Sequence, residues 1–238
     1  MRAILKKEWA QYFRSPIGYI YLGAFWCLCG LHFTLENMLA QTSAVSGLFQ
    51  NMLVILMFLL PMLTMRTFSE ETRQRTNQLL LTAPVSAAEI VLGKFLACMA
   101  ILGVGLLGTV PYHIVAAVFG EAYAANAIGG YLAVLLVSAA LVALGILISS
   151  LTDSQIIAAV VSYCLVFILW ASDSLAAFFQ GGLPGRLLSC FAILRRFQSF
   201  SIGIFDPAAV VYYVSICGLF LSLTAIFLSR SGRRKADV

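Results

Sequence analysis

The chain has 238 residues, of which 61% are hydrophobic and 11% are charged, and its formal net charge is +5. Soluble domains contain about 25% charged residues. This composition therefore excludes an ordinary soluble domain and predicts one all-α polytopic membrane domain over residues 1–238. The six cysteines lie mostly inside apolar runs, without metal-ligand or redox spacing. We expect them to pack as small apolar residues, and we expect no nucleic-acid partner.

Residues 1–15 are the first expected element, an amphipathic helix at the membrane interface. Its apolar face carries Ile4, Leu5, Trp9, Tyr12 and Phe13, and its polar face carries Lys7, Gln11 and Arg14. Aromatic rings at headgroup depth and lysines near anionic lipid are typical of helices that lie in the interface. A secretory signal peptide is not indicated, because the following apolar run is too long and no A-x-A site comes after it.

Six apolar stretches are long enough to cross a membrane as helices. They are about Ile17–Leu35, Val45–Met65, Leu92–Val118, Ile128–Leu151, Gln155–Ala171 and Ala208–Leu228. Each run is continuous and lacks the period-two alternation of a barrel strand. With six spans, twelve of the fifteen basic residues fall on one side, in the N-terminal segment, the stretch 66–94 and the C-terminal tail. The positive-inside rule then predicts that both termini and this stretch are cytoplasmic.

The stretch from Arg66 to Lys94 is the long polar interval between the second and third spans. Thr67 and Glu70 have the spacing of a capping box, which predicts that a helix follows Thr67. Glu71 and Arg75 form a favourable i,i+4 surface pair on this helix, and Leu79, Leu80 and Leu81 lie on its other face. Pro84 ends it, and Ser86 and Glu89 form a second capping box that begins the next helix. The pattern therefore predicts a short helix held at the membrane surface, although an ordinary interhelical loop would have a similar pattern.

This stretch resembles the cytoplasmic coupling segment of type-2 ABC exporter permeases. The matching residues are Glu71, Thr76, Leu79, Leu80, Leu81, Pro84, Ser86, Glu89, Ile90, Gly93 and Lys94. Two positions depart from the family pattern: Arg75 replaces a glycine and Gln78 replaces an acid. The resemblance implies that the coupling segment 66–85 and the start of the next helix contact an ATPase, through Thr67, Glu70, Glu71, Arg75, Leu79, Leu80, Pro84 and Glu89.

The segment 172–206 between the fifth and sixth spans is long and too apolar for a free loop. Such a segment must lie in the interface or dip back against protein. It resembles the re-entrant outer helices of the same family, which implies an outer gate at Phe191, Leu194 and Phe197. The region after Phe200 loosely resembles the gliding-motility and copper-export branch of the family.

The sequence offers little chemistry of its own. It contains no G-x-x-x-x-G-K-[ST] motif and no zinc-protease or serine-elbow motif. His32 and His113 are expected to be packed or interfacial residues. No acidic or basic residue falls near the middle of a predicted span, which disfavours coupling to ion gradients.

These features and the resemblance together imply a non-catalytic permease subunit of an ATP-driven ABC exporter. ATP and Mg²⁺ would be bound by a separate ATPase subunit, and this chain would hold no cofactor. The resemblance further implies a second permease copy or paralogue, contact with membrane lipids, and the cytoplasmic (inner) membrane of a prokaryote. A passive channel or scaffold subunit remains an alternative, as does, less well supported, an intramembrane lipid-modifying enzyme.

Overall fold

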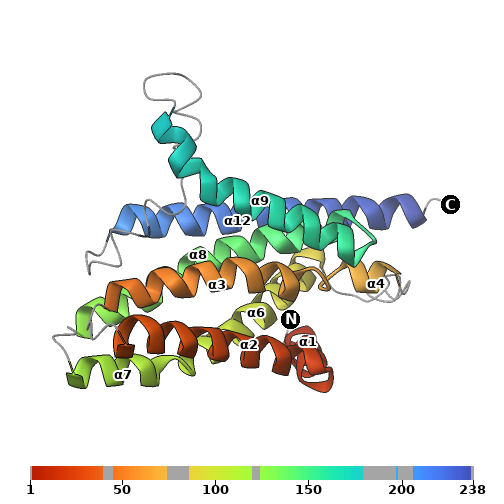
Figure 1. The fold of residues 1–238 in the computed structure, drawn as a ribbon. Helices are drawn as coiled ribbons and strands as arrows, with labels where there is room; N and C mark the ends of the chain where they lie inside the picture. The colour runs from red at the N-terminus through yellow and green to blue at the C-terminus, as the bar shows by residue number, and fades with distance from the viewer. Residues whose placement is uncertain are drawn as a thin grey trace.

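The computed structural model describes residues 2–39, 45–73, 86–119, 124–178, 197 and 206–236. Within these ranges the chain is helical and has no strand (Figure 1). The elements are α1 (Arg2–Arg14), α2 (Pro16–Phe33), the π-helical segment η1 (Thr34–Leu39), α3 (Val45–Thr64), α4 (Ser69–Arg73), α6 (Ala87–Leu107), α7 (Val110–Phe119), α8 (Ala124–Leu151), α9 (Gln155–Phe178) and α12 (Pro207–Ala236).

Within the described ranges, six helical stretches are long and apolar enough to span a membrane, which confirms the predicted number of spans. They are Pro16–Leu39, Gly47–Arg73, Ala87–Val118, Asn126–Leu151, Gln155–Ser172 and Pro207–Ser229. Most predicted boundaries agree with these to within a few residues. The second stretch extends beyond the predicted end at Met65, because α3, α4 and the turn between them form one stretch. The third begins at Ala87 instead of the predicted Leu92. The fifth helix also continues to Phe178, beyond the predicted end at Ala171.

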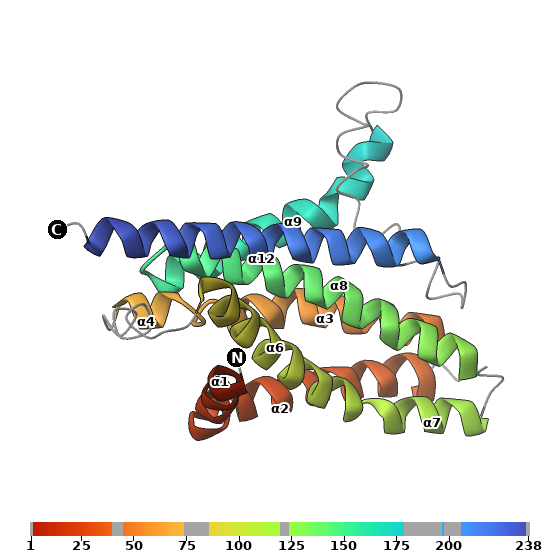
Figure 2. The same ribbon diagram turned by 180° about the vertical axis from the view of Figure 1, so that it is seen from behind.

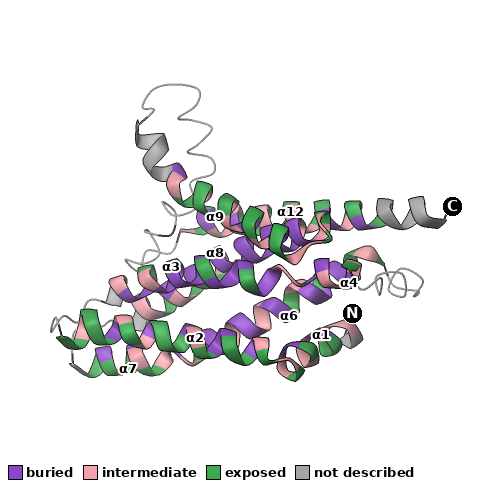
Figure 3. Ribbon diagram, turned by 45° about the vertical axis from the view of Figure 1, so that its right-hand side comes forward, coloured by how far each residue is buried: buried purple, intermediate pink, exposed green. Residues whose placement is uncertain are grey.

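α8 is the central helix of the bundle and lies between α3 and α12 (Figures 1 and 2). Of the window that defines its span, 78% is buried, against 11% for the last span on α12. Small side chains allow this packing, since Ala133, Ala140 and Ala143 are each at most 1% exposed. Large apolar side chains of α9 and α12 are exposed instead, and Figure 3 colours much of both helices as exposed. An outward apolar face is what a lipid environment favours.

The third span is broken between α6 and α7, just before Pro111. The Thr109 amide bonds to the Leu106 carbonyl at 3.1 Å, so it no longer serves the Gly105 carbonyl four residues back. The Trp26 indole N–H donates to that carbonyl at 2.9 Å. A side chain at Gly108 would collide with the same indole, because a Cβ there would lie 2.3 Å from it. Trp26 therefore both requires this glycine and satisfies the carbonyl that the break releases.

The two ends of the bundle carry different elements. α1, α4 and the C-terminal end of α12 lie at one end, on the right in Figure 1 and on the left in Figure 2. α7 and the start of α8 lie at the opposite end. This arrangement brings the N-terminal helix and the segment after the second span together, as expected if both face the same side.

Candidate functional site

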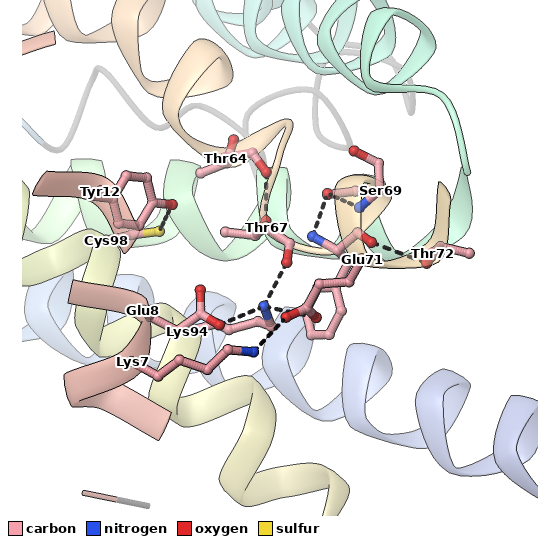
Figure 4. Close-up of polar contacts among 12 residues, drawn as sticks. Lys7, Glu8, Tyr12, Thr64, Thr67, Ser69, Glu71, Thr72, Lys94 and Cys98 are labelled. Atoms are coloured by element: carbon pink, nitrogen blue, oxygen red, sulfur yellow. Dashed lines mark hydrogen bonds and ion pairs between the residues drawn. The ribbon is translucent and has the colours of Figure 1, made fainter. Parts of the chain in front are cut away.

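Lys94 lies at the centre of a buried ionic cluster where α1, α4 and α6 meet (Figure 4). Its side chain is 1% exposed, and its ammonium donates to Glu8 Oε1 at 3.0 Å and to the Thr67 carbonyl at 2.7 Å. It also forms an ion pair with Glu71 Oε2 at 3.0 Å. The half-exposed Lys7 approaches Glu71 Oε1 at 3.4 Å. We call Lys7, Glu8, Glu71, Lys94 and the Thr67 carbonyl the Lys94 cluster.

The Lys94 cluster is balanced in charge, with two acids and two bases. A charge moved out of water is costly unless it is paired and hydrogen-bonded. The Lys94 ammonium additionally lies 4.9 Å from the centre of the Phe68 ring, a cation–π contact. Removal of any one buried member leaves an uncompensated charge, so the cluster fixes the relative positions of the three helices that supply it.

Gly93 explains how α1 comes close enough to supply Glu8. A Cβ at Gly93 would lie 2.8 Å from Ile4 Cγ2, so α1 packs directly on the backbone of α6 at this point. Glu8 is one helical turn after Ile4 and one turn before Tyr12, on the buried face of α1. Gly93 therefore allows α1 to pack closely on α6, and the neighbouring Lys94 supplies the cation that pairs with Glu8 of α1.

Tyr12 makes a second polar contact between α1 and the spans. Its hydroxyl donates to the Leu63 carbonyl at 3.3 Å and lies 3.4 Å from Cys98 Sγ. Burial raises the pKa of Tyr12 well above its usual value, with the neighbouring Cys98 as a further cause. The phenol therefore stays neutral and keeps its proton for the carbonyl.

Ser149 of α8 holds the turn between α3 and α4 from the other side. Its hydroxyl oxygen accepts hydrogen bonds from the amides of Phe68 at 3.0 Å and Ser69 at 3.2 Å, and it donates to the Met65 carbonyl at 3.0 Å. One turn earlier on α8, Gly145 has no room for a side chain, because a Cβ would lie 2.2 Å from Thr64 Oγ1. The segment after the second span is thus fixed to α6 by charge and to α8 by neutral hydrogen bonds.

The structure tests part of the predicted coupling segment. Glu89 and Ser86 form the expected capping box, with both reciprocal bonds at 3.3 Å. Thr67 was expected to cap the preceding helix, but α4 begins at Ser69, and the Thr67 hydroxyl donates to the Thr64 carbonyl at 2.5 Å. The capping function at Phe68 and Ser69 falls to Ser149. This prediction was wrong because a side chain from another helix takes the place of a local one.

Glu71 was expected on the surface, and this was also wrong. It is 7% exposed and faces Lys94 and Lys7, whereas Glu70 is half-buried. The other predicted coupling residues, Arg75, Leu79, Leu80 and Pro84, lie outside the described residues. So do Phe191 and Leu194 of the expected outer gate, while Phe197 is 3% exposed and belongs to the core.

Glu8 and Ser149 were not predicted as members of the site, and Lys94 was predicted only as a cytoplasmic base that matches the family pattern, not as a buried residue. Two of them leave a signal in the sequence. Glu8 falls on the apolar face of the first helix between Ile4 and Tyr12, and Lys94 interrupts an apolar run. An acid and a base that each break an apolar pattern are candidates for a mutual pair. Ser149 leaves no such signal, because a serine in an apolar helix is common.

A second polar cluster lies at the opposite end of the bundle and is neutral. Tyr131 places its hydroxyl 2.8 Å from His113 Nδ1 and 3.1 Å from Thr109 Oγ1. The Phe49 ring stacks on the His113 ring, with 4.6 Å between their centres. His113 is 6% exposed, so it is packed, as predicted. Among the residues that the structure describes, no group of His, Cys, Asp and Glu is arranged to hold a metal ion.

The model of the family described as ABC-2 family transporter protein matches residues 2–181. The chain belongs to this family. The matched part contains α1, α4, the first five spans and the whole Lys94 cluster. No curated protein matches the chain. An ABC-2 family member of this kind is an integral membrane permease component of an ABC transporter, and the six apolar helices agree with that.

Proposed function

We propose that this ABC-2 permease is the membrane subunit of an ATP-driven exporter, and that a separate ATPase subunit docks on the segment 66–85. The observation that carries this proposal is the Lys94 cluster. It joins α4 at the start of that segment to α1 and to the third span through buried charges. A force applied to α4 is then passed to α6 rather than lost in a loose loop.

The sidedness follows from the basic residues and from the arrangement of the ends. α4, which carries Arg73, lies at the end that also holds α1 and the C-terminal end of α12, and Lys94 bonds to Glu8 of α1 and to the Thr67 carbonyl before α4. The positive-inside rule places this end in the cytoplasm. We infer a cytoplasmic (inner) membrane of a prokaryote with both termini inside, a second permease copy or paralogue, and an outer segment 172–206 that caps the route.

The docking proposal is tested at Leu80, with Gln78 as a matched control. An amphipathic helix in a groove depends on a few apolar anchors. Leu80→Asp is therefore expected to abolish co-purification of the ATPase or its coupling, with permease abundance unchanged. Gln78→Asp adds the same charge on the opposite face, where the family usually has an acid, and should retain the ATPase. If Leu80→Asp keeps the ATPase and its coupled activity at wild-type levels, the channel or scaffold alternative is favoured.

Sidedness is tested separately by Gln74→Cys and Gln180→Cys in a background without accessible native cysteines. An impermeant thiol reagent applied to whole cells should label position 180 and spare position 74. The reverse labelling would invert the proposed topology.

A further inference from the structure

A polar cavity of about 70 Å³ lies beside the Lys94 cluster, at the corner between α1, α2 and the turn that follows α3. Its lining residues are Glu8, Gln11, Tyr12, Ser15, Ile17, Arg66, Thr67 and Glu70. One buried water needs about 10–15 Å³, so the cavity has room for a phosphate-sized group. We call it the Arg66 cavity.

Arg66 is the cation of this cavity. Its Nε atom is buried and has no hydrogen-bond partner, and no ion pair joins Arg66 to another of the described residues. Lys94 and Lys7, the other basic residues of this region, are both paired. A buried donor without an acceptor is costly, so a bound group that supplies an acceptor to Arg66 would be stabilised here. Guanidinium matches phosphate well, because its planar N–H groups can bond two oxygens at once.

The cavity adjoins the start of the first span, where we expect phospholipid headgroups. The first span begins at Pro16, between Ser15 and Ile17 of the cavity wall. α1 precedes this corner and has the aromatic and basic faces of an interfacial helix. A membrane lipid therefore presents its phosphate at this depth.

The wall also carries acids, which select among headgroups. Glu8 and Glu70 line the same cavity as Arg66. Glu8 is already paired with Lys94, but a further negative group beside Glu8 and Glu70 would add repulsion, so a headgroup that also carries an ammonium is favoured over a purely anionic one. We propose that the Arg66 cavity binds a zwitterionic phosphoethanolamine headgroup, with its phosphate on Arg66 and its ammonium toward the carboxylates of Glu8 and Glu70.

This site is continuous with the Lys94 cluster. Glu8 and Thr67 belong to both, since each lines the cavity and each also bonds Lys94. A bound headgroup would supply the acceptor that Arg66 lacks and hold α1 against the turn before α4. The lipid is thus a structural ligand of the junction, independent of whether an ATPase docks there.

The test is native mass spectrometry of the purified permease, without ATPase, titrated with phosphatidylethanolamine, phosphatidylglycerol or inorganic phosphate. The wild-type chain is expected to bind phosphatidylethanolamine about tenfold more tightly than phosphatidylglycerol, and inorganic phosphate should not displace it. Arg66→Gln should lose about tenfold or more in that affinity, because a charge-assisted contact is removed. Arg14→Gln, an exposed arginine of α1 outside the cavity, should bind as the wild type does.

If Arg66→Gln fails to fold, Arg66→Lys serves instead, because it keeps the charge and loses the planar fork, with an expected loss of about threefold or more. Equal affinities for the two lipids, displacement by inorganic phosphate, or equal binding by the Arg66 and Arg14 variants would each overturn the proposal. Because no ATPase is present, these outcomes are independent of the docking test at Leu80.

Discussion

The two ends of the bundle both bury polar side chains, but they use them differently. At one end, Lys94 of α6, Glu8 of α1 and Glu71 of α4 bring formal charges together from three helices. At the other end Tyr131, His113 and Thr109 form neutral hydrogen bonds between helices that are already packed in the core. The neutral cluster satisfies polar groups in the interior, whereas the charged cluster joins α1 and α4 to α6 in addition to the apolar packing of Tyr12 and Phe68 in the core.

This difference has an energetic consequence. Loss of one partner from a buried ion pair leaves a desolvated charge and costs about 3–5 kcal/mol, whereas loss of a neutral hydrogen bond costs about 1 kcal/mol. A single substitution is therefore expected to reduce the free energy of unfolding most at the end that we assign to the ATPase. Variants at the two ends should differ both in size of effect and in which function they disturb.

The largest effect is expected for Lys94→Met, which leaves the carboxylates of Glu8 and Glu71 without the cation that they share. Thermal or denaturant unfolding in detergent should show a loss of about 3–5 kcal/mol. Lys6→Met, which removes an exposed lysine of α1, should stay within about 0.5 kcal/mol. Adding Glu8→Gln to Lys94→Met should recover most of the loss. Equal stability of the Lys94 and Lys6 variants would mean that the cluster contributes nothing.

The next effect is expected for Ser149→Ala. It deprives the buried amides of Phe68 and Ser69 of their shared acceptor, with an expected loss of about 2–4 kcal/mol for the two together. Ser138 on the same helix is a matched control, because its buried hydroxyl has no hydrogen-bond partner. Ser138→Ala should be neutral or stabilising in the same unfolding assay. Identical behaviour of the two variants would contradict the role given to Ser149.

A smaller loss is expected for Gly145→Ala, where the new methyl group meets Thr64. Overpacking of this kind costs about 1–3 kcal/mol. Gly103 of α6 has open space around it, so Gly103→Ala should stabilise the helix by up to about 1 kcal/mol. Unfolding of both variants under the same conditions separates a steric effect from a general intolerance of alanine.

The smallest effect is expected at the neutral end. Tyr131→Phe removes the hydroxyl between His113 and Thr109 and should cost about 1 kcal/mol. ATPase binding should not change, because the site lies at the far end of the bundle. If a Tyr131→Phe permease has wild-type stability but fails to bind the ATPase, the proposed difference in function between the two ends is contradicted.

The sequence was sufficient for the fold because the signals that determine it are local or periodic. Long apolar runs predicted the six spans, and the capping box of Ser86 and Glu89, which are three residues apart, predicted the start of α6. The site was less predictable, since its contacts join residues far apart in the chain. Lys94 and Glu8 are 86 positions apart, and Ser149 takes the capping role expected of Thr67 from 80 positions away. Counting Lys94 only as one more cytoplasmic base in the topology rule missed its burial.

We propose one role for the Lys94 cluster, which is to hold α4 in the position in which the ATPase binds. Its most direct test is the affinity of the purified ATPase, identified by co-purification, for the permease in lipid nanodiscs, measured as a double-mutant cycle over Glu71→Gln and Lys94→Met. The account predicts that each single variant weakens binding by about tenfold or more and that the double variant is no weaker than the worse single variant, because both remove the same link. Folded Lys94→Met permease that binds the ATPase with wild-type affinity, or losses that simply multiply in the double variant, would contradict it.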